Sequence, residues 1–424
     1  MKKPIRVWIV RMLAGNPFED NPFERSVSFA SYLADKGYKV TFWGTAFDHA
    51  LKEQLFSETI HRIVKDNEDA VMIHVPTTYK KNMSLKRLIY SIEQGSALKK
   101  EIYKKEYDIP DIIFAAHPTA ESCNALEKYA KKHRIPVIVD QRDRWPDIFE
   151  NAFPKRIKKL GKYALIPLKK QTQRAFENAS AICAMSPKEL EFGLHYAGRK
   201  QSPLDEYIYI GRKKYIPEES KRIEYLSILN GLNVTDKTWN ICLFSSISKM
   251  SLDGDTLIEA IRMVHNTHPE IRLIVGGVGD DKERLTKLAK DSPYIQFLGH
   301  LNDDQMSTIM SICKVGVFPY KNSSMREAWG NKIGQYLSYG LPILTSTEGI
   351  AYEYFMKYKC GLKYQEGDQT SLADAIIELI NNKKELEELA DHAKDRFISD
   401  FEYGVVMGKL EKMLLRVLEN NGPI

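Results

Sequence analysis

A stretch in the second half of the chain carries residues whose types and spacing could bind an anion. Residues 326 to 346 read as a polar loop, a short helix, a glycine stop and a buried strand, with Asn331 suited to the N-cap. Lys332 would place a cation in the first turn, beside free backbone N–H groups and the positive end of the helix dipole. A bound phosphate or diphosphate would remove that conflict, although a lysine stem that bends away to the surface would also remove it.

Two other loops in the second half are suited to a diphosphate. Gly276, Gly277 and Gly279 follow a strand pattern and precede a helix, so the backbone could approach a nucleotide at Gly277 and Gly279. A plain tight turn would need the same glycines, and their spacing is neither the dinucleotide fingerprint nor a P-loop. Lys249 lies in the loop after another strand pattern and could neutralise the diphosphate from an opposite wall.

The sequence predicts no metal ion and no other cofactor. Asp253 and Asp255 could hold a divalent ion, but we expect them at the start of a helix with Asp255 as its cap. The five cysteines are far apart, odd in number and without a C-x-x-C pair. Such thiols are typical of a reducing cytoplasm, and they offer no zinc or redox motif.

Polar residues in the first half follow two strand patterns. His117 comes directly after the run Ile112 to Ala115, and it is the histidine that we expect to face a binding cleft. A hydrogen-bonded loop histidine is the equal alternative. The next run ends in three charged residues and an aromatic one, which is costly for a mere connection. This pattern predicts either a polar network that shapes an acceptor pocket or an internal salt-bridge network, formed by Arg25, Asp140, Arg142, Asp143 and Trp145.

The elements that position these residues are short buried strands alternating with amphipathic helices, a pattern typical of parallel α/β sheets. In the first half the predicted strands are Ile5 to Val10, Lys39 to Trp43, Val71 to Val75, Ile112 to Ala115, Val137 to Val139 and Ala181 to Ala184. In the second half they are Ile241 to Phe244, Arg272 to Val275, Ile295 to Leu298, Val315 to Phe318 and Pro342 to Leu344, with helices at about 255 to 266, 281 to 290, 303 to 313 and 331 to 339.

The 424 residues are too many for one ordinary core and suffice for two domains. We predict an N-terminal, acceptor-binding Rossmann-like domain at residues 1–210, completed by residues 402–424, and a C-terminal, donor-binding one at residues 211–401. Both would be doubly wound α/β domains that face each other across a cleft, with the last helix crossing back to the first domain. Ligands bind at the carboxyl ends of strands in such sheets, so the strand-to-helix loops should carry the chemistry.

Charge and hydropathy exclude some classes of protein. The chain has 62 basic and 56 acidic residues, a net charge of +6, which is too modest for a dedicated nucleic-acid binder. Basic residues gather at residues 80–105 and 155–174, either as solvated helix faces or as surfaces that adhere to an anionic membrane. No apolar run approaches the roughly 20 residues that span a bilayer, and no secretion signal is visible. We therefore expect a cytoplasmic protein, with peripheral contact at the inner membrane face as an option.

Taken together, these motifs resemble the GT-B glycosyltransferases of the retaining type in the large family 4, the glycosyl transferase group 1 enzymes. The resemblance covers nearly the whole chain and is better in the second half. The segments that carry it are YLADKGYKV at 32–40 in a helix that starts at Arg25, DQRDRWP at 140–146, ASAICAMS at 179–186, GGVGD at 276–280, IQFLG at 295–299, VFPY at 317–320 and NKIGQYLSYGLPI at 331–343.

The resemblance implies roles for particular residues. Glu327 matches the family glutamate that contacts the donor sugar, whereas the second family glutamate, which binds ribose, falls on the uncharged Gln335. Lys249 and Lys332 would stabilise charge on the departing diphosphate, and His117 would help to place donor or acceptor. The donor-binding residues that the resemblance implies are Gly277, Gly279, Ala328, Asn331 and Gln335.

The chain departs from the family pattern at two further places. The usual N-terminal glycine pair is replaced by the sequence Ala14 to Pro17. Of the basic R....K signature after the first strand of the donor domain, only Lys249 is evident. We nevertheless expect a metal-independent transfer of a hexosyl or N-acetylhexosaminyl group from a nucleotide diphosphate sugar to a hydroxyl group, with retained configuration.

The acceptor and the rival functions are less well defined by the sequence. A saccharide or lipid-linked saccharide would suit the basic segments, and it would place the protein in the biosynthesis of a cell-surface polysaccharide. One alternative is a GT-B nucleotide-sugar epimerase, which would need an acid and a base around the hexose. A second alternative is a non-catalytic protein that binds a nucleotide sugar, which the neutral Gln335 would allow.

Overall fold

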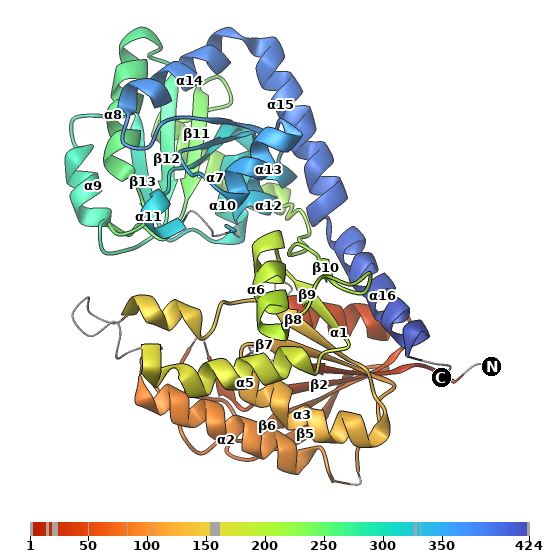
Figure 1. The fold of residues 1–424 in the computed structure, drawn as a ribbon. Helices are drawn as coiled ribbons and strands as arrows, with labels where there is room; N and C mark the ends of the chain where they lie inside the picture. The colour runs from red at the N-terminus through yellow and green to blue at the C-terminus, as the bar shows by residue number, and fades with distance from the viewer. Residues whose placement is uncertain are drawn as a thin grey trace. The chain divides into compact units, whose positions relative to one another are not determined.

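The computed structural model describes residues 3–13, 17–18, 24–49, 51–82, 84–104, 106–152, 162–325, 329–330 and 332–421. The chain divides into two compact units, the first formed by residues 1–210 with 406–424 and the second by residues 211–405. Each unit contains a parallel sheet with helices packed on it (Figure 1). The expected α/β architecture with two Rossmann-like domains is confirmed.

The first unit is built on an eight-stranded sheet in the order β10-β9-β8-β7-β1-β2-β6-β5. All neighbouring strands are parallel except β5, which runs antiparallel to β6. The strands of this sheet are β1 (Arg6–Val10), β2 (Lys39–Thr45), β5 (Ile60–Lys65), β6 (Glu68–Ile73), β7 (Ile112–His117), β8 (Val137–Gln141), β9 (Ala181–Ala184) and β10 (Glu206–Tyr207), and the small hairpin β3 (Phe47–Asp48) and β4 (Glu53–Gln54) lies apart from it.

Helices cover the sheet of the first unit and bury its apolar residues. Its helices are α1 (Arg25–Asp35), α2 (Leu85–Glu101), α3 (Ala120–His133), the 3₁₀-helix η1 (Asp147–Ala152), α5 (Ile166–Glu177) and α6 (Pro187–Ala197). Helices α2, α3, α5 and α6 pack in sequence beside one another (Figure 1). Trp8 and Val10 of β1 pack into the core with Leu126 of α3, as expected for a strand buried among helices.

The last helix, α16 (Tyr403–Asn420), belongs to the first unit from Val406 onward. The Glu411 carboxylate on this helix accepts hydrogen bonds from the Tyr32 hydroxyl at 3.1 Å and the Tyr38 hydroxyl at 2.9 Å. These bonds, together with buried Leu410 and Leu414, hold the C-terminal segment against α1.

The second unit has a six-stranded, wholly parallel sheet in the order β13-β12-β11-β14-β15-β16. Its strands are β11 (Trp239–Phe244), β12 (Ile271–Gly276), β13 (Ile295–Gly299), β14 (Cys313–Phe318), β15 (Ile343–Thr345) and β16 (Gly361–Lys363). Its helices are α7 (Glu219–Gly231), α8 (Gly254–Thr267), α9 (Lys282–Leu288), α10 (Asp303–Ile312), α11 (Asn322–Met325), α12 (Lys332–Ser338), α13 (Ile350–Tyr358), α14 (Gln369–Asn381), α15 (Lys383–Arg396) and the π-helix η3 (Phe397–Phe401).

A buried tyrosine fixes α12 against the end of β11. The Tyr336 hydroxyl accepts a hydrogen bond of 2.8 Å from the backbone N–H of Phe244, the last residue of that strand. Gly316 of β14 makes room for the ring, because a Cβ at this position would lie 2.7 Å from it. The short helix therefore presents its first residue, Lys332, at the end of the sheet where the strands terminate.

The structure corrects several expectations about individual elements. The antiparallel edge strand β5, the short strands β10 and β16 and the helix α7 have no counterpart among the predicted elements. Helix α8 begins one residue earlier than expected, with Asp253 and not Asp255 at the N-cap position. The Asp255 carboxylate instead forms an ion pair of 2.6 Å with Arg284, so the prediction that it caps the helix was wrong. None of the helices in the described ranges is both long and apolar enough to cross a bilayer.

Candidate functional site

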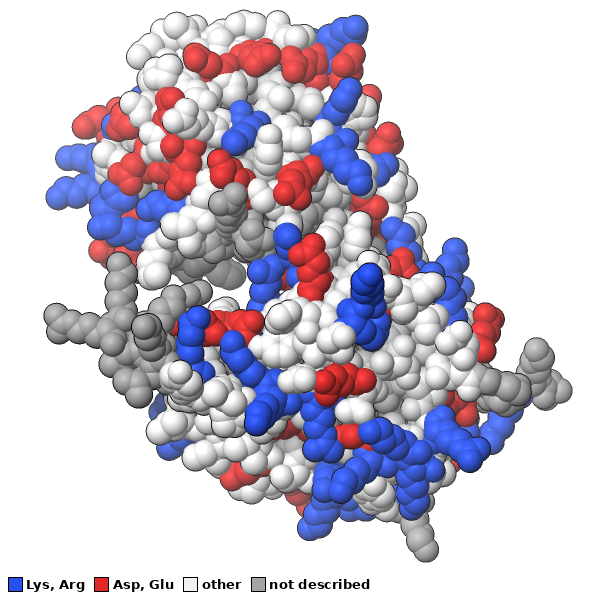
Figure 2. Space-filling view, viewed as in Figure 1, with Lys and Arg blue, Asp and Glu red and all other residues white. Residues whose placement is uncertain are grey.

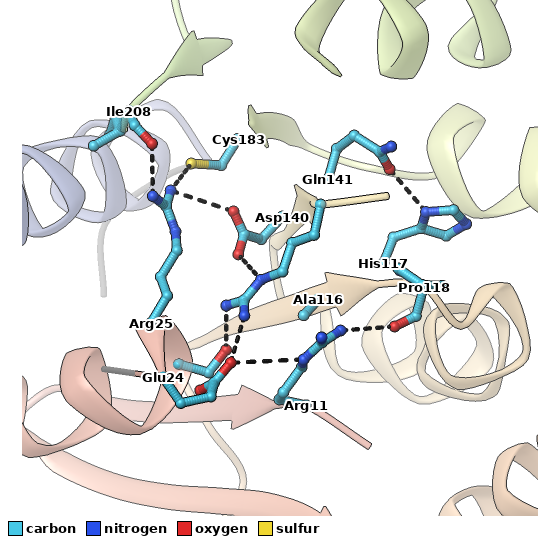
Figure 3. A network of polar contacts seen from close by, with 12 residues as sticks. Arg11, Glu24, Arg25, Ala116, His117, Pro118, Asp140, Gln141, Cys183 and Ile208 are labelled. Carbon is cyan, nitrogen blue, oxygen red and sulfur yellow. Dashed lines mark hydrogen bonds and ion pairs between the residues drawn. The ribbon is translucent and has the colours of Figure 1, made fainter. Parts of the chain in front are cut away.

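The carboxyl ends of β7 and β8 bring the polar residues of the first unit together. In the parallel register, Ala116 is the partner of Asp140 and His117 is the partner of Gln141. Successive side chains on a strand point to opposite faces of the sheet. Asp140 accordingly contacts α1 on one face, while Gln141 reaches His117 on the other (Figure 3).

Asp140 is fully buried between two arginines, Arg25 and Arg142. Its Oδ2 accepts a hydrogen bond of 2.8 Å from Arg142 Nε, and its Oδ1 lies 3.3 Å from Arg25 Nη2. Arg25 also donates to the carbonyl oxygen of Ile208 at 2.6 Å and to the Cys183 sulfur at 3.1 Å (Figure 3). The first residue of α1 is thus tied to β8, β9 and the chain beyond β9.

The network continues to the loop before α1 and to the end of β1. Arg142 donates to the Glu24 carboxylate and, at 2.6 Å, to the hydroxyl of Ser26. Arg11 Nε lies 3.7 Å from the same Glu24 carboxylate, and Arg11 Nη1 donates to the carbonyl oxygen of Pro118 at 3.0 Å. The Glu24 carboxylate also caps α1, because it accepts from the backbone N–H two residues into the helix.

Electrostatics keeps both carboxylates of this network charged. Burial alone would raise the pKa of Asp140, but the positive charges of Arg25 and Arg142 outweigh burial and lower it. The pKa of Glu24 is lowered in the same way by Arg142 and Arg11. Burial, aided by the charge of Arg142, lowers the pKa of Arg11 to about 10, so it stays a cation at neutral pH. Three arginines thus face two buried carboxylates at this edge of the sheet, and the charge of Asp143 also acts on Arg11.

Two residues that we expected in the network do not join it. The Asp143 side chain is exposed, and only its carbonyl oxygen makes recorded hydrogen bonds among the described residues, accepting from Gln141 Nε2 at 2.9 Å and from Trp145 N at 2.7 Å. The Trp145 ring lies instead beneath the Arg87 guanidinium at 4.3 Å and against Phe149 at 4.8 Å. The network prediction therefore holds for Arg25, Asp140 and Arg142, and the other two positions are corrected.

His117 is fully buried, and its tautomer follows from its neighbours. The amide nitrogen of Gln141 donates to a backbone carbonyl, so the Gln141 Oε1 must be the acceptor for His117 Nδ1–H, at 2.8 Å. Burial lowers the pKa of His117 to about 4, with the charge of Arg11 acting in the same direction. The ring is therefore neutral at pH 7, and its Nε2 is an acceptor that finds no hydrogen-bond partner among the described residues.

A cavity of about 250 Å³ lies beside His117, between α2, η1 and α5. The walls are mostly apolar and include Leu88, Trp145, Phe149, Leu165 and Leu168. The polar groups among the lining residues include Arg87 and Glu121. Burial lowers the pKa of Arg87 to about 10 and raises the pKa of Glu121. His117, which carries the Nε2 acceptor, therefore lines a mostly apolar cavity with few polar groups. This composition is typical of a small-molecule site.

The buried neutral His117 is expected to make stability depend on pH. Below pH 6.5 the unfolded histidine takes up a proton, whereas the folded one resists until about pH 4, so stability is lost as the pH falls through that window. The difference between the two pKa values corresponds to about 3 kcal/mol. Urea unfolding of the wild type and of His117→Gln from pH 7 to pH 4 measures this contribution as the pH-dependent part of the difference between them. A difference that stays constant with pH would contradict the assignment, since the other titrating groups are common to both proteins.

In the second unit, Lys332 points inward and not into solvent. It is half-buried, and its Nζ donates to Gln335 Oε1 at 3.2 Å and lies 3.7 Å from the Met306 sulfur. Burial lowers the pKa of Lys332, the charge of Arg212 lowers it further, and Asp303 offsets part of the effect. Lys332 thus combines partial desolvation, a neutral amide partner and a neighbouring arginine, an arrangement that favours an anionic ligand.

The glycines after β12 are required by the approach of a neighbouring loop. Gly277 has a φ of +142°, and a Cβ there would lie 1.8 Å from the Ser245 carbonyl oxygen. A Cβ at Gly279 would lie 2.0 Å from the Ile247 carbonyl oxygen. Backbone hydrogen bonds join the two loops, including one of 3.0 Å from Ile247 N to the Val278 carbonyl oxygen. Close packing of the loops after β11 and β12 therefore explains both glycines, and their contact with a donor remains a prediction.

Lys249 lies in the loop after β11 with an exposed side chain. Its backbone N–H donates to the Asp280 carboxylate at 3.2 Å, and its carbonyl oxygen accepts from Lys321 Nζ at 2.9 Å. These bonds fix the loop and leave the Lys249 ammonium directed to solvent. Three predicted donor-site residues, Glu327, Ala328 and Asn331, lie outside the described residues.

The described part of the chain contains no cluster of three or more His, Cys, Asp or Glu side chains that could hold a metal ion. Of the two acidic residues that might have formed a metal pair, Asp253 accepts from the backbone N–H of Gly367 at 3.0 Å and Asp255 pairs with Arg284. All five cysteines are buried free thiols.

Several residues of these sites were not identified from the sequence. They are Arg11, Glu24, Arg87, Glu121 and Gln141. Arg11 directly follows the first strand and Glu24 directly precedes the first helix, so their positions in the sequence carried a usable signal. Arg87 carried none, because nothing in the α2 sequence indicates that its guanidinium covers a tryptophan of a distant loop.

The match to a known protein family lies within the second unit. Residues 239–396, which lie within the second unit, match the family model of glycosyl transferases group 1. The chain is 24% identical over 152 residues to a glycogen synthase of Mycobacterium tuberculosis (strain CDC 1551 / Oshkosh), covering 35% of this chain and 36% of that protein. It is 26% identical over 166 residues to an alpha-monoglucosyldiacylglycerol synthase of Acholeplasma laidlawii, covering 38% and 40%. These matches span well under half of the relatives' length.

Solved structures match the fold over almost the whole chain. Sucrose-phosphate synthase from Thermosynechococcus elongatus superposes with a TM-score of 0.69 at 15% identity, covering 98% of this chain and 100% of that one. The Anabaena protein Alr3699/HepE in complex with UDP-glucose superposes with a TM-score of 0.62 at 15% identity, covering 97% and 100%. The chain therefore has the GT-B fold of glycosyltransferases. Within its second unit, residues 239–396 are similar to the glycosyl transferases group 1 family.

Proposed function

We propose that the protein is a retaining glycosyltransferase that moves a sugar from a nucleotide diphosphate sugar to a hydroxyl group of an acceptor. Support comes from the glycosyl transferases group 1 match of residues 239–396 and from relatives named as synthases of glycogen and of a glucosylated lipid. A structural neighbour that binds UDP-glucose favours a nucleotide-sugar donor for this chain as well.

The environment of Lys332 is the observation that carries the proposal. Among the described residues, the half-buried ammonium of Lys332 has hydrogen-bond contacts with an amide oxygen and a sulfur, and the charge of Asp303 offsets only part of the effect of burial and of Arg212 on its pKa, which is a poor arrangement for stability alone. The diphosphate of a donor would place negative charge beside Lys332, in the neighbourhood of Arg212. Gln335 would then hold the Lys332 side chain in place without competing for that charge.

In the proposed reaction, the bond between the anomeric carbon and the diphosphate oxygen breaks with both electrons going to the diphosphate. The acceptor oxygen forms the new bond to the anomeric carbon on the same face, and its proton leaves with the diphosphate. Lys332 would stabilise the charge that develops on the leaving group. In the first unit, the neutral Nε2 of His117 would accept a hydrogen bond from a substrate hydroxyl and so orient it. Proton NMR of the freshly formed product tests retention at the anomeric carbon.

The acceptor that we propose is a saccharide or a lipid-linked saccharide in the biosynthesis of a cell-surface polysaccharide. This context suits a cytoplasmic protein that uses activated sugars and meets its acceptor at the inner membrane face. The basic residues of α2 and α5 favour such a location.

Calorimetric titration with UDP, GDP, ADP, TDP and CMP, and with their common sugars, tests the donor. Tight binding of one diphosphate, and release of the same diphosphate when sugar and acceptor are both present, would support transfer. Binding of none of these nucleotides by a well-folded sample would leave the fold unchanged and would refute the proposed function.

Transfer is expected to proceed without a divalent metal ion. The cations that we propose for the leaving diphosphate belong to the protein itself, namely Lys332, Arg212 and Lys249. Turnover should therefore change by less than about twofold after dialysis against EDTA, since a lysine can take the role that a metal ion plays elsewhere. Recovery of lost activity by added Mg²⁺ or Mn²⁺ would show instead that a metal ion takes part.

A further inference from the structure

The cavity beside His117 is large enough for part of a ligand only. Its volume of about 250 Å³ is below the range of about 300–1,000 Å³ that is usual for whole small-molecule sites. Leu88, Phe149, Leu165 and Leu168 form an apolar wall, and two of these residues lie on α5 or directly before it. A segment of hydrocarbon suits this chamber better than a sugar, whose hydroxyl groups would find few partners.

The apolar surface continues outside the cavity along α2. Leu85, Ile89 and Ile92 are 79%, 47% and 50% exposed and recur at helical spacing. The same helix buries polar residues, and Gln94 donates to the Thr119 hydroxyl at 2.5 Å inside the unit. Helix α2 buries Tyr90 and Leu98 in the unit, and in addition it exposes an apolar stripe that an ordinary surface helix lacks. Because Leu85 also lines the cavity, the outer stripe and the chamber are continuous.

Apolar residues close in sequence to the lining residues Phe149 and Leu165 are also exposed. Ile148 of η1 is 55% exposed, and Tyr163 and Ile166 near the start of α5 are 72% and 41% exposed. Exposed apolar residues on α2, on η1 and near the start of α5, beside an apolar cavity, indicate a surface that binds a partner or a membrane.

Basic side chains flank this surface. A groove next to the cavity is lined by Lys99 of α2 and by Lys170 and Arg174 of α5, and it shares Glu121 with the cavity. Within the described residues, Lys99 and Lys170 form no ion pair, whereas Arg174 pairs with Glu127 at 2.5 Å. Burial raises the pKa of Glu121 and so favours its neutral form beside an anion. Figure 2 shows many Lys and Arg side chains, in blue, on the face of the first unit that is turned to the viewer.

The inner end of the cavity carries the polar side chain of His117, and Arg87 and Glu121 are among the other polar residues that line it. His117 Nε2 is a neutral acceptor to which no group in the described part of the chain donates, and it lies where the cavity meets β7. A ligand that fits all parts has a hydrocarbon chain for the cavity, an anionic group for Lys99 and Lys170, and a hydroxyl group. Lipids that carry a phosphate have this chemistry, and lysines beside an apolar stripe are typical of surfaces that contact anionic bilayers.

We propose that the cavity between α2, η1 and α5 binds the hydrocarbon part of an anionic lipid, with α2 lying on the bilayer and Lys99 and Lys170 contacting phosphate. This inference rests on the proposed transfer only in assigning that lipid as the acceptor, whose hydroxyl oxygen would form the bond to the anomeric carbon. The lipid site itself requires no donor and can be tested alone.

Sedimentation with vesicles tests the bilayer contact. The wild type is expected to bind vesicles of phosphatidylcholine with phosphatidylglycerol and to bind phosphatidylcholine alone poorly. Leu85→Gln should weaken binding about tenfold, because a nearly whole leucine side chain would no longer enter the bilayer. Ile63→Gln is the matched control, since Ile63 is 82% exposed on β5 of the same unit. Equal binding by both variants would overturn the proposal.

The charge contribution has its own pair of variants. Lys99→Gln and Lys170→Gln should each weaken binding to the anionic vesicles about fivefold. Lys128→Gln, an exposed lysine of α3, should leave binding unchanged. Added inorganic phosphate separates a lipid from a free anion: binding of phosphate at these lysines without binding of vesicles would overturn the lipid assignment. Self-association that Leu85→Gln abolishes, again without vesicle binding, would assign the surface to a second copy of the chain and would also overturn it.

The fluorescence of Trp145 in the cavity wall reports directly on whether an acyl chain of the lipid enters the cavity. Phosphatidylglycerol brominated along its acyl chains should quench the protein fluorescence, and Trp145→Phe should lose most of that quenching. Quenching that is the same in both proteins would show that no chain enters the cavity. Lipid binding without sugar transfer would support the lipid site and refute the proposed function. Transfer to a water-soluble saccharide without quenching would support the proposed function and refute the lipid site.

Discussion

Replacing Lys332 by alanine is expected to weaken the binding of the donor diphosphate about ten- to a hundredfold. A hydrogen bond between charged groups contributes about 1.5–3 kcal/mol, which corresponds to that range of affinity. Turnover relative to KM should fall further, by about 10²–10³-fold, because the charge on the diphosphate grows as the sugar leaves. Calorimetry with the preferred diphosphate and steady-state kinetics with its sugar measure the two effects separately.

The structure predicts no loss of stability in Lys332→Ala, so weaker binding by this variant can be separated from unfolding. Alanine is the best helix former, and removing a cation from the first turn of α12 relieves an unfavourable interaction with the helix dipole. The thermal midpoint should therefore stay level or rise while binding is lost. Lys314→Ala is the matched control, since Lys314 is exposed at the beginning of β14, away from the carboxyl ends of the strands. Unchanged diphosphate affinity in Lys332→Ala would place the donor site elsewhere.

The sheets could be predicted from the sequence because their strands are buried on both faces. Runs such as Ile112 to Ala115 and Ile241 to Phe244 are continuous in apolar residues, and both lie within parallel strands of the structure. The edge strand β5 lacks this signal, because Ile63 is exposed and the strand also contains His61, Arg62 and Lys65. Half-exposed edge strands resemble loops in composition, so a reading based on apolar runs misses them.

Part of the polar network could be predicted for a similar reason. Asp140 lies near the end of the buried strand β8 and Arg142 follows it directly, so the position of the strand end indicated where both residues lie. Asp143 and Trp145 lie farther along the loop, where the direction of each side chain depends on partners from other elements. Trp145 contacts Arg87, which is more than fifty residues away in the sequence. No local pattern reports such a contact.

The glycines of the second unit illustrate a different limit. Their clustering correctly indicated a place where backbone comes close, but the nearest neighbour in the structure is the loop containing Ser245 and Ile247. A tight loop-to-loop contact and a nucleotide-binding turn require the same residue type. The exposed leucine and isoleucine residues of α2 could not be predicted for a related reason. An apolar stripe on a helix is normally expected to face the core, whereas here it faces outward.

Replacing Asp140 by alanine is expected to destabilise the first unit by about 3–5 kcal/mol, the usual cost of removing one partner from a buried ion pair. Arg25 and Arg142 would remain almost fully buried without the carboxylate that they share. Hydrogen exchange measured by mass spectrometry should show faster exchange in β7 and β8, while β12 of the second unit serves as an internal reference. Asp140→Asn should lose most of the same stability, because it keeps the shape but not the charge.

The control for this prediction is an ion pair of the same unit in solvent. Asp35 is 70% exposed in its pair with Lys65, and Asp35→Asn should cost at most about 1 kcal/mol. Loss of stability by Asp140→Ala no larger than that of Asp35→Asn would show that water reaches the network and replaces the carboxylate. A large loss would establish that the network is what holds the start of α1 against β8, and that it thereby fixes Arg11 beside the loop that carries His117.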